Sequence, residues 1–255
     1  MKSVFVIAQN TFREIIRDRI LYGLIIFALL LIAVSLALGQ LSFKEQARIA
    51  INFGLTGIHL SVVILAIFVG STIVYREIEK QTILTLLARP ITRTQFLIGK
   101  YLGLAGVIFA VMSSLSVVLL LITLGIGFEV NSSFVSAIIG VYFEALILLA
   151  FSMLFGSFSR PTMSVVFVIG IFLIGHWLDS LSFFAKKSGS QMFIFFSEVT
   201  AKVLPNLELF NWRAAPVLDE TVPLSELLAA SGYMFGWVLL ILATSFIIFR
   251  RKDFV

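Results

Sequence analysis

Ionisable side chains inside long apolar runs are the residues of this sequence most able to do chemistry. Glu144 stands near the middle of such a run, where an ionised carboxylate in a bilayer costs a few kcal/mol unless it faces protein, water or a partner. Two roles stay open for this intramembrane polar candidate. It is either a functional carboxylate or the acceptor of a structural hydrogen bond from a Ser or Thr of a neighbouring helix.

His59, His176 and Asp179 are the other candidates for ligand or proton chemistry. The spacing of His176 and Asp179 places both side chains on one face of a helix, where they could bind a metal ion or a proton. Two ligands do not make a metal site, and His or Asp residues at a membrane edge commonly contact water alone. We therefore expect no metal site on this chain.

Enzyme chemistry finds little support in the sequence. The chain has no cysteine, which excludes a thiolate nucleophile, a disulfide framework and cysteine-ligated zinc or iron–sulfur centres. The motifs G-x-S-x-G and H-E-x-x-H are missing, which argues against an intramembrane hydrolase. No G-x-x-x-x-G-K-[ST] loop is present to cradle phosphates. We expect the chain to be no enzyme and to carry no cofactor.

The elements that must position these residues are membrane helices. The 255 residues are 60% hydrophobic and only 13% charged, too apolar for a soluble surface. A bilayer core about 30 Å thick needs roughly 20 apolar residues of helix. We expect an all-α polytopic protein, one transmembrane domain over 1–255. Its six predicted transmembrane helices are 20–39, 55–75, 101–128, 134–158, 163–181 and 228–249.

The charge distribution predicts the orientation of the six spans. Thirteen of the 19 Lys and Arg residues fall on the side that holds both termini. Because positive charge favours the cytoplasmic side, we expect both termini to be cytoplasmic. The basic residues are spread between apolar runs rather than gathered in a patch, so we expect no nucleic-acid partner.

Two amphipathic segments lie outside the spans. In 1–19, apolar residues recur at three- and four-residue steps, which predicts an N-terminal interfacial helix on the membrane surface. In the external segment 182–227, the stretch Met192 to Leu204 has an apolar side. It predicts a helix on or in the outer leaflet that ends before Pro205.

Two pairs of glycines have the spacing that permits close helix contact. Gly99 and Gly103 stand at the start of the third span, and Gly232 and Gly236 stand in the sixth. We expect both pairs to pack within one subunit.

The cytoplasmic loop 76–100 is charged first and apolar next. Glu77 and Glu79 are expected near a helix N-terminus, which favours anions. Pro90 then ends that helix, and Thr92 caps a second one. Two short amphipathic helices on the cytoplasmic face could dock a protein or pack on their own bundle. Periodicity leaves both readings open.

This loop resembles the first cytoplasmic loop of ABC-2 type ABC transporter permeases. The likeness lies in two glutamates, a basic residue and a threonine, followed by Leu-Leu, Arg-Pro-Ile-Thr-Arg and Gly-Lys. It extends to the N-terminal helix, the six spans, the stretch from Pro205 to Asn211, and the terminal stretch from Phe249 to Phe254. One departure is Gln81, where the family usually has a Gly that eases the approach of two backbones.

The resemblance implies an ABC-2, type V exporter-like permease of the bacterial inner membrane. It implies a homodimer or heterodimer with a second permease copy, and two ABC ATPase subunits that bind ATP and Mg²⁺. It also implies export of a substrate along a path lined by the second and fifth spans. The coupling helices that would contact the ATPases contain Glu77, Glu79, Lys80, Thr82, Leu86, Leu87, Arg89, Pro90, Thr92 and Arg93.

An alternative function keeps the ATPase coupling but drops the cargo path. In that case the chain is a mechanotransmitting subunit that passes ATPase motion to a periplasmic or motility partner. The feature that would serve this role is the external stretch from Lys186 to Glu226, which is large enough to dock a protein.

Overall fold

The computed structural model describes residues 2–40, 46–79, 92–127 and 131–250, and their regular structure is helical. Among these described residues, six helices are long and apolar enough to cross a membrane, which confirms the predicted number. The elements are α1 (Lys2–Ile16), α2 (Arg19–Gln40), α3 (Gln46–Glu79), α5 (Arg93–Gly125), α6 (Ser132–Gly156), α7 (Pro161–Ser188), α8 (Gln191–Val203), the 3-10 helix η1 (Glu208–Phe210), α9 (Ala215–Leu218) and α10 (Leu224–Arg250).

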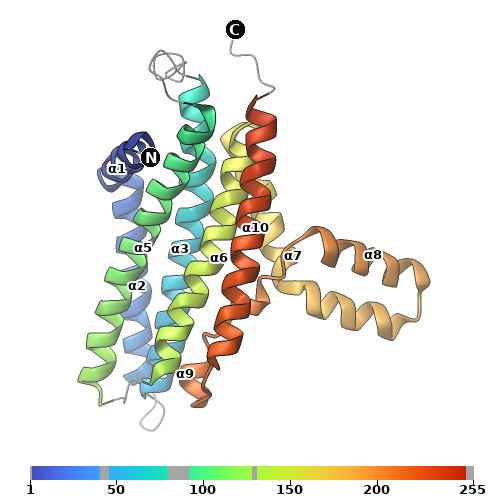
Figure 1. Ribbon diagram of the computed structural model, residues 1–255. Helices are drawn as coiled ribbons and strands as arrows, with labels where there is room; N and C mark the ends of the chain where they lie inside the picture. Colours follow the sequence, from blue (N-terminus) through green and yellow to red (C-terminus); the bar gives the residue numbers. More distant parts are fainter. Residues whose placement is uncertain (1, 41–45, 80–91, 128–130, 251–255) are drawn as a thin grey trace.

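The long helices α2, α3, α5, α6 and α10 run side by side as a bundle (Figure 1). The helices α3 and α6 are the most enclosed of them, and they carry much of the apolar core. The helix α1 lies at the end of the bundle where α10 also ends (Figure 1). This agrees with six crossings, because an even number returns the chain to the side where it began.

Several helices extend beyond the apolar runs that predict them. The helix α3 begins at Gln46, well before the run at 55–75, and α7 continues to Ser188, past the run at 163–181. Hydropathy marks only the apolar part of a helix, whereas its backbone hydrogen bonds continue to a cap. In α7 that cap is Gly189, whose φ of 66° is left-handed and costs a glycine little.

The C-terminal part of α7 and the helix α8 project sideways from the bundle as a helical hairpin (Figure 1). Ser182 and Ser197 are 3.2 Å apart across the hairpin, and Ala185 is buried within it. The range of α8 corresponds to the helix predicted before Pro205. Phe195 and Phe196 of α8 are exposed, so the hairpin presents an apolar surface.

The N-terminal helix α1 packs on α5 through the first pair of glycines. Ile7, Thr11 and Ile15 are buried. A Cβ on Gly99 would lie 2.7 Å from Cβ of Ile7, and one on Gly103 would lie 2.6 Å from the carbonyl oxygen of Ala8. The apolar side of α1 is therefore covered in part by α5. The remainder of that side is free to contact a membrane surface, as predicted for an interfacial helix.

The second pair of glycines behaves differently. A Cβ on Gly232 or Gly236 would meet nothing within 4 Å among the described residues. The expectation that this pair packs within one subunit is wrong for the part of the chain that the structure describes. Both glycines belong to a face of α10 that includes the exposed Phe235 and Leu239.

Candidate functional site

The structure describes the two ends of the predicted coupling loop. Glu77 and Glu79 belong to the last turn of α3, and Thr92 and Arg93 stand at the start of α5. The expectation that the two glutamates lie near a helix N-terminus is wrong, because α3 continues through them. The remaining predicted coupling residues lie outside the described residues: Lys80, Thr82, Leu86, Leu87, Arg89 and Pro90.

Lys100 offsets the unfavourable position of Glu77 at a helix C-terminus. Its ammonium forms a close ion pair with Glu77 Oε1 and lies 3.5 Å from Glu14 Oε2. The side chain of Lys100 is only 7% exposed, and a buried ammonium is costly unless it is paired. This ion cluster, Glu14–Lys100–Glu77, ties α1, α5 and α3 together at the base of the loop.

Thr92 caps the helix that follows the loop. Its hydroxyl accepts a hydrogen bond from the backbone N–H of Gln95 at 3.3 Å, and the Gln95 side chain accepts from the Thr92 N–H at 3.2 Å. This capping box confirms the prediction for Thr92. The helix that it starts is α5 itself, so the expected second short helix is the beginning of the third span.

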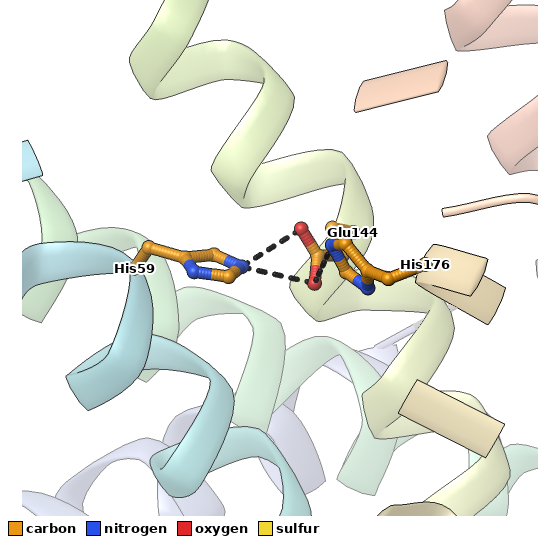
Figure 2. A group of neighbouring side chains, drawn as sticks. All are labelled: His59, Glu144 and His176. Atoms are coloured by element: carbon orange, nitrogen blue, oxygen red, sulfur yellow. Dashed lines mark hydrogen bonds and ion pairs between the residues drawn. The ribbon is translucent and has the colours of Figure 1, made fainter. Parts of the chain in front are cut away.

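Glu144 lies in the interior of the bundle, with its side chain 2% exposed. Its two carboxylate oxygens are 2.9 and 3.0 Å from Nε2 of His59 on α3 (Figure 2). Nε2 of His176 on α7 lies 3.7 Å from Oε1 of the same carboxylate. The structural reading of Glu144 named a Ser or Thr as its partner, but the nearest partners are two histidines from other helices.

Arg213 extends this cluster to the segment between η1 and α9. Its guanidinium donates to Nδ1 of His59 at 2.7 Å and to Oδ1 of Asn211 at 2.8 Å. A guanidinium only donates, so Nδ1 of His59 accepts, and the proton of a neutral His59 is on Nε2, directed at Glu144. Burial lowers the pKa of Arg213, while Glu144 and Glu208 oppose this shift. Arg213 remains a cation at neutral pH.

The stretch 204–219, which we call the docked segment, holds Arg213 against the bundle. The Leu207 N–H donates to the carbonyl of Gly175 at 3.1 Å, and the Asn206 N–H donates to the Tyr233 hydroxyl at 2.8 Å. Phe210 is 1% exposed, and its carbonyl lies so close to Gly140 that a Cβ there would collide with it. The segment therefore needs glycines on the helices that receive it.

His176 and Asp179 do not form a joint site. Nδ1 of His176 lies 3.1 Å from the carbonyl of Phe172, one turn earlier on the same helix, and its Nε2 faces Glu144. Asp179 accepts a hydrogen bond from the Asn206 side chain at 3.1 Å. His176 and Asp179 are close in sequence on α7, but each residue contacts a different partner in the fold. Their spacing therefore does not predict a shared ligand site.

The sequence indicated His59, Glu144 and His176 as separate candidates, but it did not predict that their side chains lie next to one another. It did not indicate Arg213 at all. A usable signal for the first three was that each ionisable group interrupts an apolar run. Arg213 carries no such signal, because it stands between helices and outside the long apolar runs.

Comparison with known proteins gives the family. Residues 5–254 match the family described as ABC-2 family transporter protein. No curated protein matches the sequence. The family match spans nearly the whole chain, including all six candidate spans and the docked segment. The chain therefore belongs to the ABC-2 family of transporter membrane proteins.

Proposed function

We propose that this membrane subunit is a permease that couples ATP hydrolysis by two separate ATPase subunits to export of a substrate across the inner membrane. The sequence has no phosphate-binding loop motif, so ATP and Mg²⁺ would be bound by the partner ATPases. The observation that carries the proposal is the Glu14–Lys100–Glu77 ion cluster at the base of the predicted coupling loop.

The ion cluster is suited to transmit force. The predicted coupling loop 76–100 includes Glu77, which is among the last residues of α3, and Arg93, which begins the 33-residue helix α5. Separating the buried ammonium of Lys100 from Glu77 would cost several kcal/mol. A movement of the loop is therefore passed to α1, α3 and α5 together rather than absorbed by one helix end.

A second permease copy would complete the export path. Family resemblance suggests that the second and fifth spans, α3 and α7, line it. The helix α7 leaves large apolar residues exposed, including Phe167, Leu173 and Trp177, which a second permease copy could cover. The helix α3 is mostly enclosed, and its exposed large residues are fewer, among them Leu60 and Phe68. In this arrangement both termini face the cytoplasm, on the same side as the coupling loop.

The external region favours transport over mechanotransmission. The docked segment 204–219 is folded against the bundle, so part of the surface proposed for a periplasmic partner is already covered. The projecting hairpin exposes Phe184, Met192 and Phe195, which suit lipid contact better than a soluble partner. Co-purification of a soluble external protein with the subunit would favour mechanotransmission instead.

The coupling assignment can be tested by co-expressing the subunit with the ABC ATPase that co-purifies with the wild-type protein. We expect Leu86→Asp with Leu87→Asp to leave the subunit in the membrane with an unchanged melting temperature, yet to remove the co-purified ATPase and its activity. The matched control is Leu218→Asp, which changes an exposed leucine of α9 outside the loop. If the double variant keeps its ATPase and its activity, the coupling assignment is wrong.

A further inference from the structure

The only two histidines of the chain, His59 and His176, face the same buried carboxylate (Figure 2). They come from α3 and α7, and Glu144 comes from α6. We propose that these three side chains bind one divalent transition-metal ion, with zinc as the best fit. Each side chain offers one ligand atom, and these atoms all lie within 4.8 Å of one another. The sequence led us to expect no metal site because it suggested only His176 and Asp179 as a pair of ligands. In the structure these two side chains contact different partners.

The donor set matches zinc chemistry. Two imidazole nitrogens and one carboxylate oxygen form a common three-ligand zinc site with a fourth position for water. Ligands about 2.0–2.1 Å from a tetrahedral ion lie about 3.3 Å from one another. The distances from Glu144 are 2.9 and 3.0 Å to His59 Nε2 and 3.7 Å to His176 Nε2. Because the three ligand atoms lie within 4.8 Å of one another, the most distant pair would have to approach by at most about 1.5 Å to bind one ion.

His176 is already oriented as a ligand. Its Nδ1 lies 3.1 Å from the Phe172 carbonyl and must donate to it, which leaves the lone pair on Nε2 in the neutral ring. This Nε2 is buried and makes no hydrogen bond with the described residues. In this neutral form of His176, the lone pair on Nε2 faces a carboxylate oxygen at 3.7 Å and is repelled by it. A cation between the two atoms would replace this repulsion with two favourable contacts.

Arg213 makes metal binding sensitive to the docked segment. A metal on Nε2 of His59 requires the ring proton on Nδ1, the atom that now accepts from Arg213. The ion would therefore displace the guanidinium from His59, and it would also repel the positive charge of Arg213. Arg213 would keep its hydrogen bond to Asn211. Metal binding and the Arg213–His59 contact are thus in competition.

The test uses the full chain, purified in nanodiscs with a tag that contains no histidine and stripped with a chelator. Bound zinc is measured by mass spectrometry, and Co²⁺ binding is followed by its visible absorption bands, which report nitrogen and oxygen ligands. The absence of cysteine removes thiolate sites that would compete. We expect about one equivalent of metal per chain.

Three variants separate the site from other metal binding. His176→Gln should weaken Co²⁺ binding by at least about tenfold, since even partners of metal ligands contribute 10- to 100-fold. The control Asp179→Asn, on the same helix one turn away, should bind like the wild type. Arg213→Gln should bind more tightly, because the positive charge is removed and the shorter, neutral side chain withdraws the guanidinium from Nδ1 of His59.

Two results would overturn the proposal. One is substoichiometric binding by the wild type at saturating zinc, and the other is His176→Gln binding as tightly as the wild type. A cooperative melting transition and an elution profile like that of the wild type show that each variant is folded. Because the readout is metal content rather than transport, the result stands apart from the proposed export function.

Discussion

Arg213 donates a 2.7 Å hydrogen bond to Nδ1 of His59, and through that ring it is linked to the buried carboxylate of Glu144. The contact joins the docked segment, outside the spans, to the centre of the bundle. The contact orients the proton of His59 toward Glu144. It also places a positive charge near the buried carboxylate of Glu144. The side chain that positions the intramembrane cluster therefore comes from a loop.

Removing Arg213 should destabilise the subunit more than removing another external arginine. We expect Arg213→Ala to cost about 1.5–3 kcal/mol, the usual contribution of a hydrogen bond to a charged group. The control is Arg48→Ala, because Arg48 lies 4.0 Å from Asp219 with both side chains more than half exposed. Such surface pairs contribute about 0–1 kcal/mol. Thermal unfolding in one detergent measures both, and equal losses would contradict a special role for Arg213.

Lys100 and Glu77 should show strong energetic coupling. Lys100→Met removes the buried cation that faces Glu77, and Glu77→Gln leaves the exposed Glu14 as the anion that faces Lys100 among the described residues, so each should cost about 3 kcal/mol. The double variant should lose much less than the sum, because no unpaired buried charge remains. Glu14→Gln, at a 61% exposed side chain, is the control and should cost under about 1 kcal/mol. Additive losses in a denaturant titration would show that the pair is not coupled.

The six spans were predictable because each is an apolar run of bilayer length, and run length depends only on local sequence. Thr92 and Pro205 were predictable for the same reason, since capping and helix termination are local. The end of α3 was not. The helix continues through Glu77 because Lys100, on another helix, neutralises a charge that its own terminus disfavours.

The candidate site was predictable only as separate residues. His59, Glu144 and His176 each interrupt an apolar run, but the faces on which they lie depend on how α3, α6 and α7 pack. Arg213 reaches these residues because Gly140 and Gly175 have no side chain and leave room for the docked segment. No local sequence pattern predicts that the segment packs against these two glycines. The wrong expectation for Gly232 and Gly236 has the same origin, because spacing alone does not say which face of α10 is covered.

Gly103 should be required for the contact between α1 and α5. A Cβ there would lie 2.6 Å from the Ala8 carbonyl oxygen, a distance that forces backbone to move. We expect Gly103→Ala to lower the melting temperature despite the roughly 1 kcal/mol that alanine gains over glycine in a helix. Gly23→Ala, where a Cβ would meet nothing within 4 Å, should be neutral or stabilising. If both substitutions behave alike, α1 does not pack closely on α5.

Gly140 should be required for docking of the segment that carries Arg213. A Cβ on Gly140 would collide with the Phe210 carbonyl and approach the ring of Trp212 to 3.0 Å. Trp212 is buried and donates to Glu226 at 3.1 Å, so its fluorescence can report docking once Trp177 and Trp237 are replaced by Phe. We expect Gly140→Ala to increase quenching of Trp212 by acrylamide, because the displaced segment admits solvent.

Gly170→Ala is the matched control for this measurement, since a Cβ at Gly170 would meet nothing within 4 Å. It should leave the quenching of Trp212 unchanged. The same Gly140→Ala protein should also lose the stabilisation by Arg213, because a displaced segment carries the guanidinium away from His59. Adding Arg213→Ala to Gly140→Ala should therefore cost little more. A full additional loss would mean that the segment stays docked and that Gly140 serves only the packing of α6.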